Sequence, residues 1–255
     1  SNETTIVAAA GSGSPGNGTV TVTVDTGATY TSTQEWTYVE ASQVDSFAPT
    51  TGQEGTYVTV RGQGLFGGGS SIARVTLAGV AAEVLAGSNS TYVVARAGAG
   101  AAGAGRVVVE SNTGARAVAG PDFTYTAAGV VSGLAPSSGQ RGTVVTISGE
   151  RLLGGASDAS VVLLGGEAAT VVTANATEVV VEASNGTAGV GDVEIESTSG
   201  AIVRGENAWE QLEEGRITSV TPDSGVSGTR VTVRGTSLFG GSTGLAVVTL
   251  NGVAA

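Results

Sequence analysis

One short motif in the sequence has the residue types of half an aspartic-protease site. It is Asp25–Thr26–Gly27, which follows the apolar stretch VTVTV. That chemistry needs two facing carboxylates that share a proton. In the internal repeat described below, the corresponding triplets are Asn112–Thr113–Gly114 and Thr198–Ser199–Gly200, so the carboxylate is lost from both. Because an Asx residue two positions before a glycine is typical of tight turns, we predict a hairpin turn instead of a catalytic dyad.

A second motif, GAGAAG from Gly98 to Gly103, matches the G-x-G-x-x-G pattern of dinucleotide-binding sites. In that site a helix follows the glycines, and its N-terminus faces the pyrophosphate. Here the glycines are followed by RVVVES, which has the composition of a strand. The corresponding segments elsewhere read GSGSPG and SNGTAG. We therefore predict a loop between two strands and no bound cofactor.

Asparagine sequons are the chemical signal that remains. The sequence N-x-Ser/Thr marks an acceptor for N-linked glycans in secreted proteins. About two such sequons are expected by chance from this composition, but five are present. The predicted N-glycosylation sites are Asn2, Asn17, Asn89, Asn175 and Asn185. Three of them occupy the same place in successive repeats, which simple copying of a domain would also explain, so glycan occupancy stays an expectation.

The composition argues against several classes of function. The chain has 255 residues, with neither His nor Cys, which removes the commonest general base, thiolates and disulfides. Its net charge is −11 and all basic residues are Arg, so we expect no nucleic-acid partner. No apolar stretch is long enough to cross a bilayer. The acidic residues do not recur at each joint between repeats, so calcium is not expected. We predict a protein that is not an enzyme and has no catalytic, metal or cofactor site.

The elements that carry these motifs repeat with a fixed stride. Pro49, Pro136 and Pro222 begin matching segments, and the steps between them are 87 and 86 residues. Trp36, Phe123 and Trp209 are separated by the same steps, and so are Asn2, Asn89 and Asn175. A period of this length indicates one supersecondary unit copied in tandem. The predicted domains are the C-terminal half of a repeat at residues 1–42, complete repeats at 43–129 and 130–215, and an N-terminal half at 216–255.

One repeat predicts seven short strands. In the copy from Val130 to Gly215 the strand-like runs are VVSGLAP, GTVVTISG, ASVVLLGG, EAATVVTAN, EVVVEAS, GDVEIES and AIVRGENAW. They are rich in Val, Ile and Thr, they are separated by turn residues, and in GTVVTISG the side chains of Val145 and Ile147 alternate with those of Val144 and Thr146. This pattern predicts an antiparallel β-sandwich. We expect Trp36, Phe123 and Trp209 to fill its core from one side, and Leu65, Leu152 and Leu238 from the other.

One motif recurs in all three copies. It consists of a proline, a glycine three residues on, Gly-Thr, a Val-x-Val strand, and a Leu-Phe-Gly-Gly segment. In the first copy these residues are Pro49, Gly52, Gly55, Thr56, Val58, Val60, Gly62, Leu65, Phe66 and Gly67. The motif recurs from Pro136, where Leu153 replaces the Phe, and from Pro222. This motif resembles the IPT/TIG family of immunoglobulin-like domains. The resemblance implies an E-set β-sandwich of the kind found in plexin-like receptors, bacterial and algal surface proteins, and Rel-type transcription factors. The family's cysteines and its basic DNA-contacting loops are missing here.

These observations favour an extracellular structural segment. About five residues join successive repeats, so we expect neighbouring sandwiches to stack as a rod within a long glycosylated surface or filament protein, such as a fibre, flagellar hair or adhesin stalk. Its partners would be neighbouring copies of itself and glycans. The alternative is a ligand-binding ectodomain of a receptor or adhesin, which would use the loops Leu65–Gly69, Leu152–Gly155 and Leu238–Gly241. The two end halves also allow either one continuous chain, which we favour, or subunits that complete each other head to tail.

Overall fold

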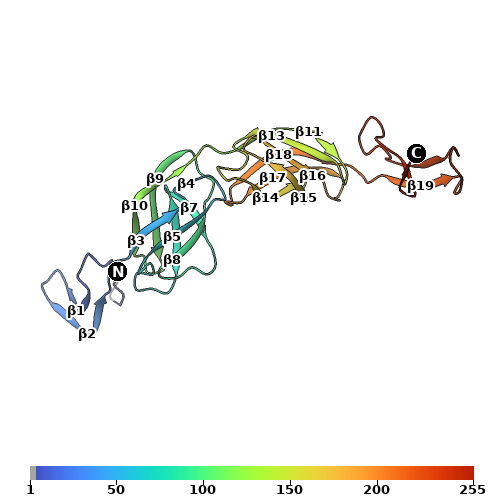
Figure 1. Ribbon diagram of the computed structural model, residues 1–255. Coiled ribbons are helices and arrows are strands. Elements are labelled where there is room, and N and C mark those ends of the chain that lie inside the picture. The colour runs from blue at the N-terminus through green and yellow to red at the C-terminus, as the bar shows by residue number, and fades with distance from the viewer. Residues whose placement is uncertain (1–3) are drawn as a thin grey trace. The chain divides into compact units, whose positions relative to one another are not determined.

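The computed structural model describes residues 4–255, and in this range the chain forms 22 strands and no helix (Figure 1). The chain divides into two compact units. The first unit contains the chain up to Ala48 together with Thr59–Ala95 and Arg106–Asp122. The second unit contains Pro49–Val58, Arg96–Gly105 and the chain from Phe123 onward. The predicted all-β class is confirmed.

The N-terminal segment forms a hairpin. Its strands are β1 (Gly16–Thr23) and β2 (Thr29–Tyr38), which pair antiparallel. Thr and Val dominate β1 and Thr and aromatic residues dominate β2, and both types favour extended backbone. By sequence position this hairpin corresponds to the last two long strands of each complete repeat.

The first complete repeat forms an eight-stranded sheet with the order β3-β5-β8-β7-β6-β9-β10-β4. Its strands are β3 (Gln43–Ala48), β4 (Thr51–Gly52), β5 (Tyr57–Gln63), β6 (Ile72–Leu77), β7 (Val80–Val84), β8 (Tyr92–Arg96), β9 (Gly103–Ser111) and β10 (Arg116–Tyr125). The two-residue strand β4 lies parallel to the end of β10, where Thr51 pairs with Thr124.

The second complete repeat has the same order of strands, β11-β13-β16-β15-β14-β17-β18-β12. Its strands are β11 (Val130–Ala135), β12 (Ser138–Gly139), β13 (Val144–Glu150), β14 (Ala159–Leu164), β15 (Glu167–Ala174), β16 (Glu178–Glu182), β17 (Gly189–Ser197) and β18 (Ile202–Gln211). All seven strands expected in this copy are present. The eighth, β12, was missed because two residues are too few to show an alternating pattern.

Strand β15 connects the two layers of the second repeat. Glu167–Ala169 pairs with β14, whereas Thr170–Ala174 pairs with β16, with a register shift between Val171 and Thr173. A bulge of this kind increases the local twist and lets one strand serve two sheets. The eight strands therefore curl into a sandwich rather than forming a flat sheet.

The C-terminal segment has four short strands. They are β19 (Arg216–Thr221), β20 (Thr232–Thr236), β21 (Thr249–Leu250) and β22 (Val253–Ala254). β19 pairs antiparallel with β20, and β21 pairs antiparallel with β22. These strands correspond to β11, β13, β14 and the start of β15 in the complete repeat.

The core of the second repeat lies between its layers, around Trp209. This ring is fully buried in a cluster that includes Leu152, Val162, Val181 and Ile195. Val145 and Ile147 point inward and Val144 outward, as the alternation predicted. Removing an aromatic ring of this size from water contributes about 2–3 kcal/mol. In the first repeat Phe123 and Leu65 are also buried, so the predicted core positions are confirmed in both complete copies.

The same positions are exposed in the two terminal segments. Trp36 is 49% exposed and Leu238 is 37% exposed. The prediction that these two side chains fill a core is therefore wrong for the described residues. The physical reason is that each segment contains only part of the strands of a sandwich, so no opposite layer of its own repeat covers the apolar side chain.

Candidate functional sites at the turns, sequons and joints

The triplet Asp25–Thr26–Gly27 forms the turn between β1 and β2. The Gly27 amide donates to the Val24 carbonyl at 2.9 Å, and the Val24 amide donates to the Ala28 carbonyl at 3.0 Å. Gly27 has a φ of 88°, a conformation that favours glycine. The corresponding glycines, Gly114 and Gly200, close the same turn with φ values of 86° and 83°. The predicted hairpin turn is confirmed.

The glycine-rich motif at residues 98–103 connects strand β8 to strand β9. A strand follows the glycines, as predicted, and not the helix that a dinucleotide site requires. The Tyr125 ring explains one of the glycines, because a Cβ atom on Gly100 would lie 3.0 Å from it. Gly13 faces Tyr38 in the same way, with a distance of 2.8 Å. These glycines make room for an aromatic ring.

Two of the sequon asparagines have the same local structure. The Oδ1 atom of Asn89 accepts hydrogen bonds from the amide and hydroxyl of Thr91, at 2.9 and 3.0 Å. Asn175 accepts the same two bonds from Thr177, at the same distances. Both asparagine side chains are exposed and precede a strand. The amide oxygen therefore stabilises the turn, while the amide nitrogen is the atom that a glycan would modify.

The remaining predicted sites are distributed over other elements. Asn17 is exposed on β1, and its Oδ1 atom accepts a hydrogen bond from the Thr37 hydroxyl at 2.8 Å. Asn185 is exposed in the connection between β16 and β17. Asn2 lies outside the described residues. The described sequons are thus accessible and separate from one another in sequence, and they do not form one site.

A buried glutamine outside the predicted sites links the start of one repeat to the start of the next. Gln53 lies after β4, in the second compact unit, and is almost fully buried. Its Oε1 atom accepts a hydrogen bond from the Gly129 amide at 3.0 Å, and its Nε2 atom donates to the Ile202 carbonyl at 3.2 Å. Both the oxygen and the nitrogen of the side-chain amide are therefore hydrogen-bonded, as is usual for a buried polar group.

Gln140 holds the corresponding position in the next copy. Its Oε1 atom accepts a hydrogen bond from the Gly215 amide at 2.7 Å. In the third copy the position is occupied by Val226, which cannot accept such a bond. The sequence carried this signal as the recurring G-Q-E/R-G segment, where a glutamine returns after 87 residues. Its role could not be predicted, because the bonded glycines lie 75 or 76 residues away.

The Leu-Phe-Gly-Gly motif provides the surface against which each glutamine packs. A Cβ atom on Gly154 would lie 3.0 Å from the Gln53 side-chain amide, and one on Gly240 would lie 2.6 Å from that of Gln140. Both glycines also have left-handed backbone, with φ of 56° and 55°. The glutamine near the start of the motif in one copy therefore contacts the glycine loop at the end of the motif in the next copy.

Charged side chains surround the Gln53 joint within the second unit. Arg204 binds Glu54 at 2.8 Å and Glu194 at 2.8 Å, and the pKa of its guanidinium is raised, first by the bond to Glu54. The Tyr57 hydroxyl donates to Glu196 at 3.2 Å. The backbone adds two bonds here, from the Tyr57 amide to the Ser199 carbonyl and from the Ile202 amide to the Glu54 carbonyl, both at 2.9 Å. Because the ion pairs are partly exposed, the backbone and glutamine bonds matter more.

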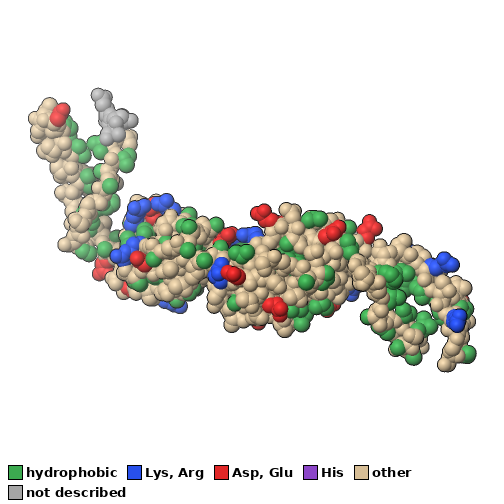
Figure 2. Space-filling view, turned by 90° about the horizontal axis from the view of Figure 1, so that it is seen from above, with side chains coloured by type: hydrophobic (Ala, Val, Ile, Leu, Met, Phe, Trp, Pro, Cys, Tyr) green, Lys and Arg blue, Asp and Glu red, His purple; other side chains and the backbone are tan. Residues whose placement is uncertain are grey.

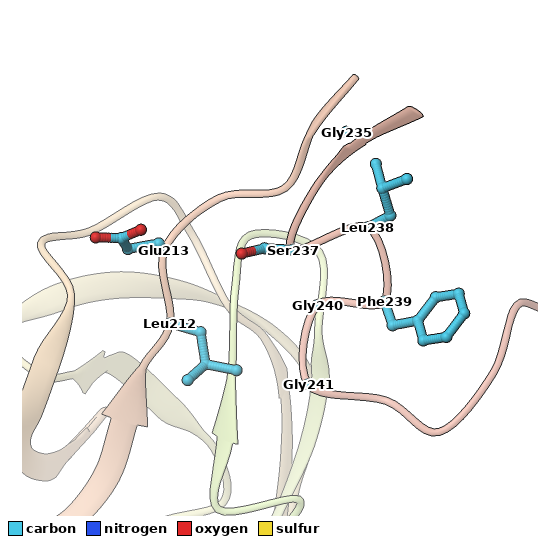
Figure 3. Close-up of a pocket in the computed structure, with 8 residues that line it drawn as sticks. All are labelled: Leu212, Glu213, Gly235, Ser237, Leu238, Phe239, Gly240 and Gly241. Atoms are coloured by element: carbon cyan, nitrogen blue, oxygen red, sulfur yellow. The ribbon is translucent and has the colours of Figure 1, made fainter. Parts of the chain in front are cut away.

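An open hollow of about 610 Å³ lies beside the C-terminal segment (Figure 3). It is lined by Leu212, Glu213, Gly235, Ser237, Leu238, Phe239, Gly240 and Gly241. Figure 3 shows Leu212 directed toward the loop of Gly240 and Gly241, while Phe239 points away from Leu212. The lining is mainly apolar, and Leu238 is the position that the complete repeats bury.

A separate charged cluster lies on the first unit. Glu110 on β9 accepts hydrogen bonds from Arg116 at 2.8 Å and from Arg74 at 2.9 Å. These bonds lower the pKa of Glu110, and the bond from Arg116 has the larger effect. On the face shown in Figure 2, charged side chains occur singly or in small groups over the surface. Among residues 4–255, no cluster of three acidic side chains is arranged to hold a metal ion.

The part of the chain that the structure describes contains no helix with the length and apolarity to span a bilayer.

The sequence matches the family model for the IPT/TIG domain over residues 42–125 and 130–207. These two matches cover more than half of the chain, and the protein therefore belongs to the IPT/TIG family. This confirms the family suggested by the repeated motif. No curated protein matches the sequence.

The fold is similar to several solved structures of low sequence identity. The plexin A4 full extracellular region is 20% identical, with a TM-score of 0.46, and the match covers 71% of this chain and 16% of that chain. The Bacteroides ovatus mixed-linkage glucan utilisation protein SGBP-B, in complex with a heptasaccharide, is 16% identical, with a TM-score of 0.28 and coverage of 79% and 53%. SGBP-B from a Bacteroides uniformis xyloglucan locus is 20% identical, with a TM-score of 0.29 and coverage of 67% and 50%. The chain thus spans about a sixth of the plexin chain and about half of the other two.

Proposed function

We propose that this chain is an extracellular structural segment, in which IPT/TIG repeats serve as spacers in a long glycosylated surface or filament protein. The observation that supports this most is the recurring joint glutamine. Gln53 and Gln140 each bind the glycine that precedes the next repeat, Gly129 or Gly215. A spacer needs similar joints between successive copies. A side-chain amide with fixed partners, buried at Gln53 and partly buried at Gln140, restricts the joint more than a flexible linker does.

The loops of the Leu-Phe-Gly-Gly motif support the same proposal. In the second repeat the loop Leu152–Gly155 packs against Gln53 through Gly154. Leu152 and Leu153 are both buried. A loop that is used for packing between copies presents little of its surface to a ligand. A spacing role therefore accounts for the repetition of this motif better than recognition does.

Glycans form the second part of the proposal. Asn89 and Asn175 are exposed and adopt the same turn, so a glycan could be attached at both without disturbing the core. Mass spectrometry of glycopeptides from the native protein is expected to find glycans at both positions. Unmodified Asn89 and Asn175 in native material would remove this part of the proposal and leave the spacing role intact.

The spacing role is tested by measuring the distance between two repeats. Because the chain has no Cys, spin labels can be attached at Ala86→Cys and Thr173→Cys. Both positions are exposed, and they correspond to each other in the two complete repeats to within one residue. A narrow distance distribution by pulsed electron resonance is expected. The matched control adds Gln53→Val, which should broaden it. A broad distribution in the unmodified joint would contradict the spacer proposal.

A recognition module is the second candidate function, and the hollow beside Leu238 favours it. Apolar hollows with a few polar groups are the usual form of ligand sites. This one is lined by Leu212, Leu238 and Phe239, with Glu213 at its edge. Capture of one defined oligosaccharide or protein ligand by the chain, abolished by Phe239→Ala, would favour recognition over spacing.

A further inference from the structure

Three asparagines in the chain are followed directly by glycine, and they are Asn17, Asn185 and Asn251. In an Asn-Gly pair the backbone nitrogen of the glycine can attack the side-chain carbonyl carbon of the asparagine. Glycine favours this reaction because it has no Cβ atom to obstruct the approach and tolerates the backbone rotation that the approach needs. Both groups must be free to move toward each other, so the fold decides which pair reacts.

The first pair is restrained by a strand. Within β1, Asn17 lies opposite Thr37 of β2, and Gly18 lies opposite Trp36. The Oδ1 atom of Asn17 accepts a hydrogen bond from the Thr37 hydroxyl at 2.8 Å. The strand pairing holds the backbone extended and the hydrogen bond holds the side chain, so ring closure at Asn17 is disfavoured.

The third pair is restrained by a tight turn. Asn251 and Gly252 connect β21 to β22, and Leu250 pairs with Val253 across the turn. The two turn residues have φ values of 51° and 78°. Positive φ at both central residues is the geometry of a two-residue hairpin loop, which fixes the backbone at this pair.

Asn185 is free of both restraints. It is exposed in the connection between β16 and β17 and belongs to no strand. Among residues 4–255, no hydrogen bond involves the Asn185 side chain or the backbone amide of Gly186. The connection is held at its two ends, where the Ser184 hydroxyl donates to the Ala168 carbonyl and β17 begins at Gly189. The attacking nitrogen and the carbonyl group are therefore both accessible.

Packing explains the glycine of this pair. Gly186 corresponds to Gly100 of the first complete repeat, where a Cβ atom would lie 3.0 Å from the Tyr125 ring. A Cβ atom on Gly186 would lie 3.0 Å from the Cγ atom of Glu167. It would also lie 3.5 Å from the side chain of Gln211, the residue at the position of Tyr125. The glycine at this position therefore makes room for neighbouring side chains in both complete repeats.

The residue before this glycine differs between the copies. In order along the chain it is Ser12, Ala99 and Asn185. The sandwich does not need an asparagine here, since Ala99 serves in the first complete repeat. Among these three copies, the second repeat alone places an asparagine before the glycine.

We propose that Asn185 is a site of spontaneous deamidation. The Gly186 nitrogen forms a bond to the Cγ atom of Asn185, the Cγ–Nδ2 bond breaks, and Nδ2 leaves as ammonia with the amide proton of Gly186. The product is a cyclic succinimide, which one water molecule then opens. Addition of water at Cγ gives aspartate, and addition at the backbone carbonyl carbon of Asn185 gives isoaspartate. The sequence of steps consumes one water and releases one ammonia.

The modification changes the site in two ways. Both products add a negative charge and destroy the sequon formed by Asn185, Gly186 and Thr187. Isoaspartate also lengthens the backbone between the held positions Ser184 and Gly189. A glycan would use the same Nδ2 atom that deamidation removes, so the two modifications exclude each other at this residue. The inference goes beyond the spacer proposal and does not depend on it.

Peptide mapping of the unglycosylated full chain tests the proposal. The protein is aged at neutral pH in water enriched in heavy oxygen, so that the label marks deamidation in the intact chain rather than during digestion. Cleavage after arginine places the three Asn-Gly pairs in separate peptides. Asn185 is expected to convert at least about tenfold faster than Asn17 or Asn251. In urea, where the restraints are removed, the three pairs should convert at similar rates.

Two results of this mapping would overturn the proposal. One is conversion of Asn185 no faster than that of the other two pairs in the folded chain. The other is an equal advantage of Asn185 in urea, which would show that the fold does not select it. The ring mechanism has its own readout, because it yields isoaspartate together with aspartate. Aspartate alone would indicate direct hydrolysis and contradict attack by the backbone nitrogen.

Substitutions identify the reacting pair. Gly186→Ala places a Cβ atom beside the attacking nitrogen and should slow the conversion of Asn185 by about tenfold. The new atom would meet the flexible side chain of Glu167, which can move away. Thr187→Ala is the matched control, because Thr187 is exposed in the same connection and lies outside the pair. It should leave the rate in unglycosylated protein unchanged. Equal rates in the unmodified chain and in Gly186→Ala would contradict the proposal.

Discussion

Gln53 accepts a hydrogen bond from the amide of Gly129 at 3.0 Å, although 76 residues separate them in the sequence. The bond joins the segment after β4 to the residue that precedes β11. It recurs between Gln140 and Gly215 at 2.7 Å. The glutamine therefore links the beginning of one copy to the beginning of the next.

Replacement of Gln53 by Val is expected to lower the free energy of unfolding by about 1–3 kcal/mol. The reason is that the Gly129 amide and the Ile202 carbonyl would both lose a partner in a buried place. Valine is the residue found at the third copy, as Val226. Urea unfolding measures the change, and amide exchange measures the Gly129 proton directly, which should become faster.

Gln63→Ala is the control for this variant, because Gln63 is exposed at the end of β5. It should change the stability by less than about 0.5 kcal/mol. Equal losses in the two variants would show that the Gln53 bonds contribute nothing specific.

Substitutions at the two glycines of the Leu-Phe-Gly-Gly motif can distinguish the cost of backbone strain from the cost of overpacking. Gly154 and Gly155 both have positive φ, 56° and 90°. A Cβ atom on Gly154 would lie 2.4 Å from that of Ala201, whereas one on Gly155 would meet nothing within 4 Å. Gly155→Ala should therefore cost only the strain of left-handed backbone, about 1–2 kcal/mol.

Gly154→Ala should cost more, because overpacking adds about 1–3 kcal/mol to that strain. Thermal unfolding of the two variants measures the difference. A loss for Gly154→Ala no larger than that for Gly155→Ala would show that the loop moves away from Ala201 without cost.

The repeat period made much of this fold predictable from sequence. The alternation in GTVVTISG placed Val145 and Ile147 inside, and the position of Trp209 near the last strand placed it in the core. Local pattern was sufficient because side chains on a strand alternate between two faces. The turn at Asp25–Gly27 was predictable for the same reason, since its chemistry is local.

The joints and the ends were not predictable in this way. The partners of Gln53 lie 76 and 149 residues away, and no local pattern identifies them. Trp36 has the same sequence context as Trp209 but is exposed, because burial depends on strands that the terminal segment lacks. Sequence similarity between repeats thus predicts which surface a side chain occupies in a complete sandwich, and not whether that surface is covered.

The two roles of Asn175 can be separated by substitution. Asn175→Asp keeps the oxygen that accepts hydrogen bonds from Thr177 and Glu178, but destroys the sequon. Asn175→Ala removes both. We expect Asp to leave the thermal stability of unglycosylated protein within about 0.5 kcal/mol of the original. We expect Ala to cost about 0.5–1.5 kcal/mol through the lost bonds. Equal stability of the two variants would show that the turn does not depend on the side-chain oxygen.

The titration of Glu110 tests the charged cluster on β9. Its pKa is lowered from 4.5, first by Arg116 and then by Arg74. A lowered folded-state pKa means that the carboxylate stabilises the fold above the unfolded value, and that this contribution is lost as the pH falls through the folded value. Arg116→Gln should raise the pKa of Glu110 toward 4.5 in an NMR titration. An unchanged pKa would show that Arg74 alone determines it.

The paired tryptophans provide the sharpest comparison of covered and uncovered core positions. Trp209 is fully buried and Trp36 is 49% exposed, although they occupy the same position in the repeat. Trp209→Ala should destabilise the second repeat by about 3–5 kcal/mol, since it leaves a cavity in a closed core. Trp36→Ala should change the stability by less than about 0.5 kcal/mol. Acrylamide quenching measures the same difference, because the exposed Trp36 should be quenched readily and the buried Trp209 should be protected. Equal protection of the two rings would contradict the difference in their exposure.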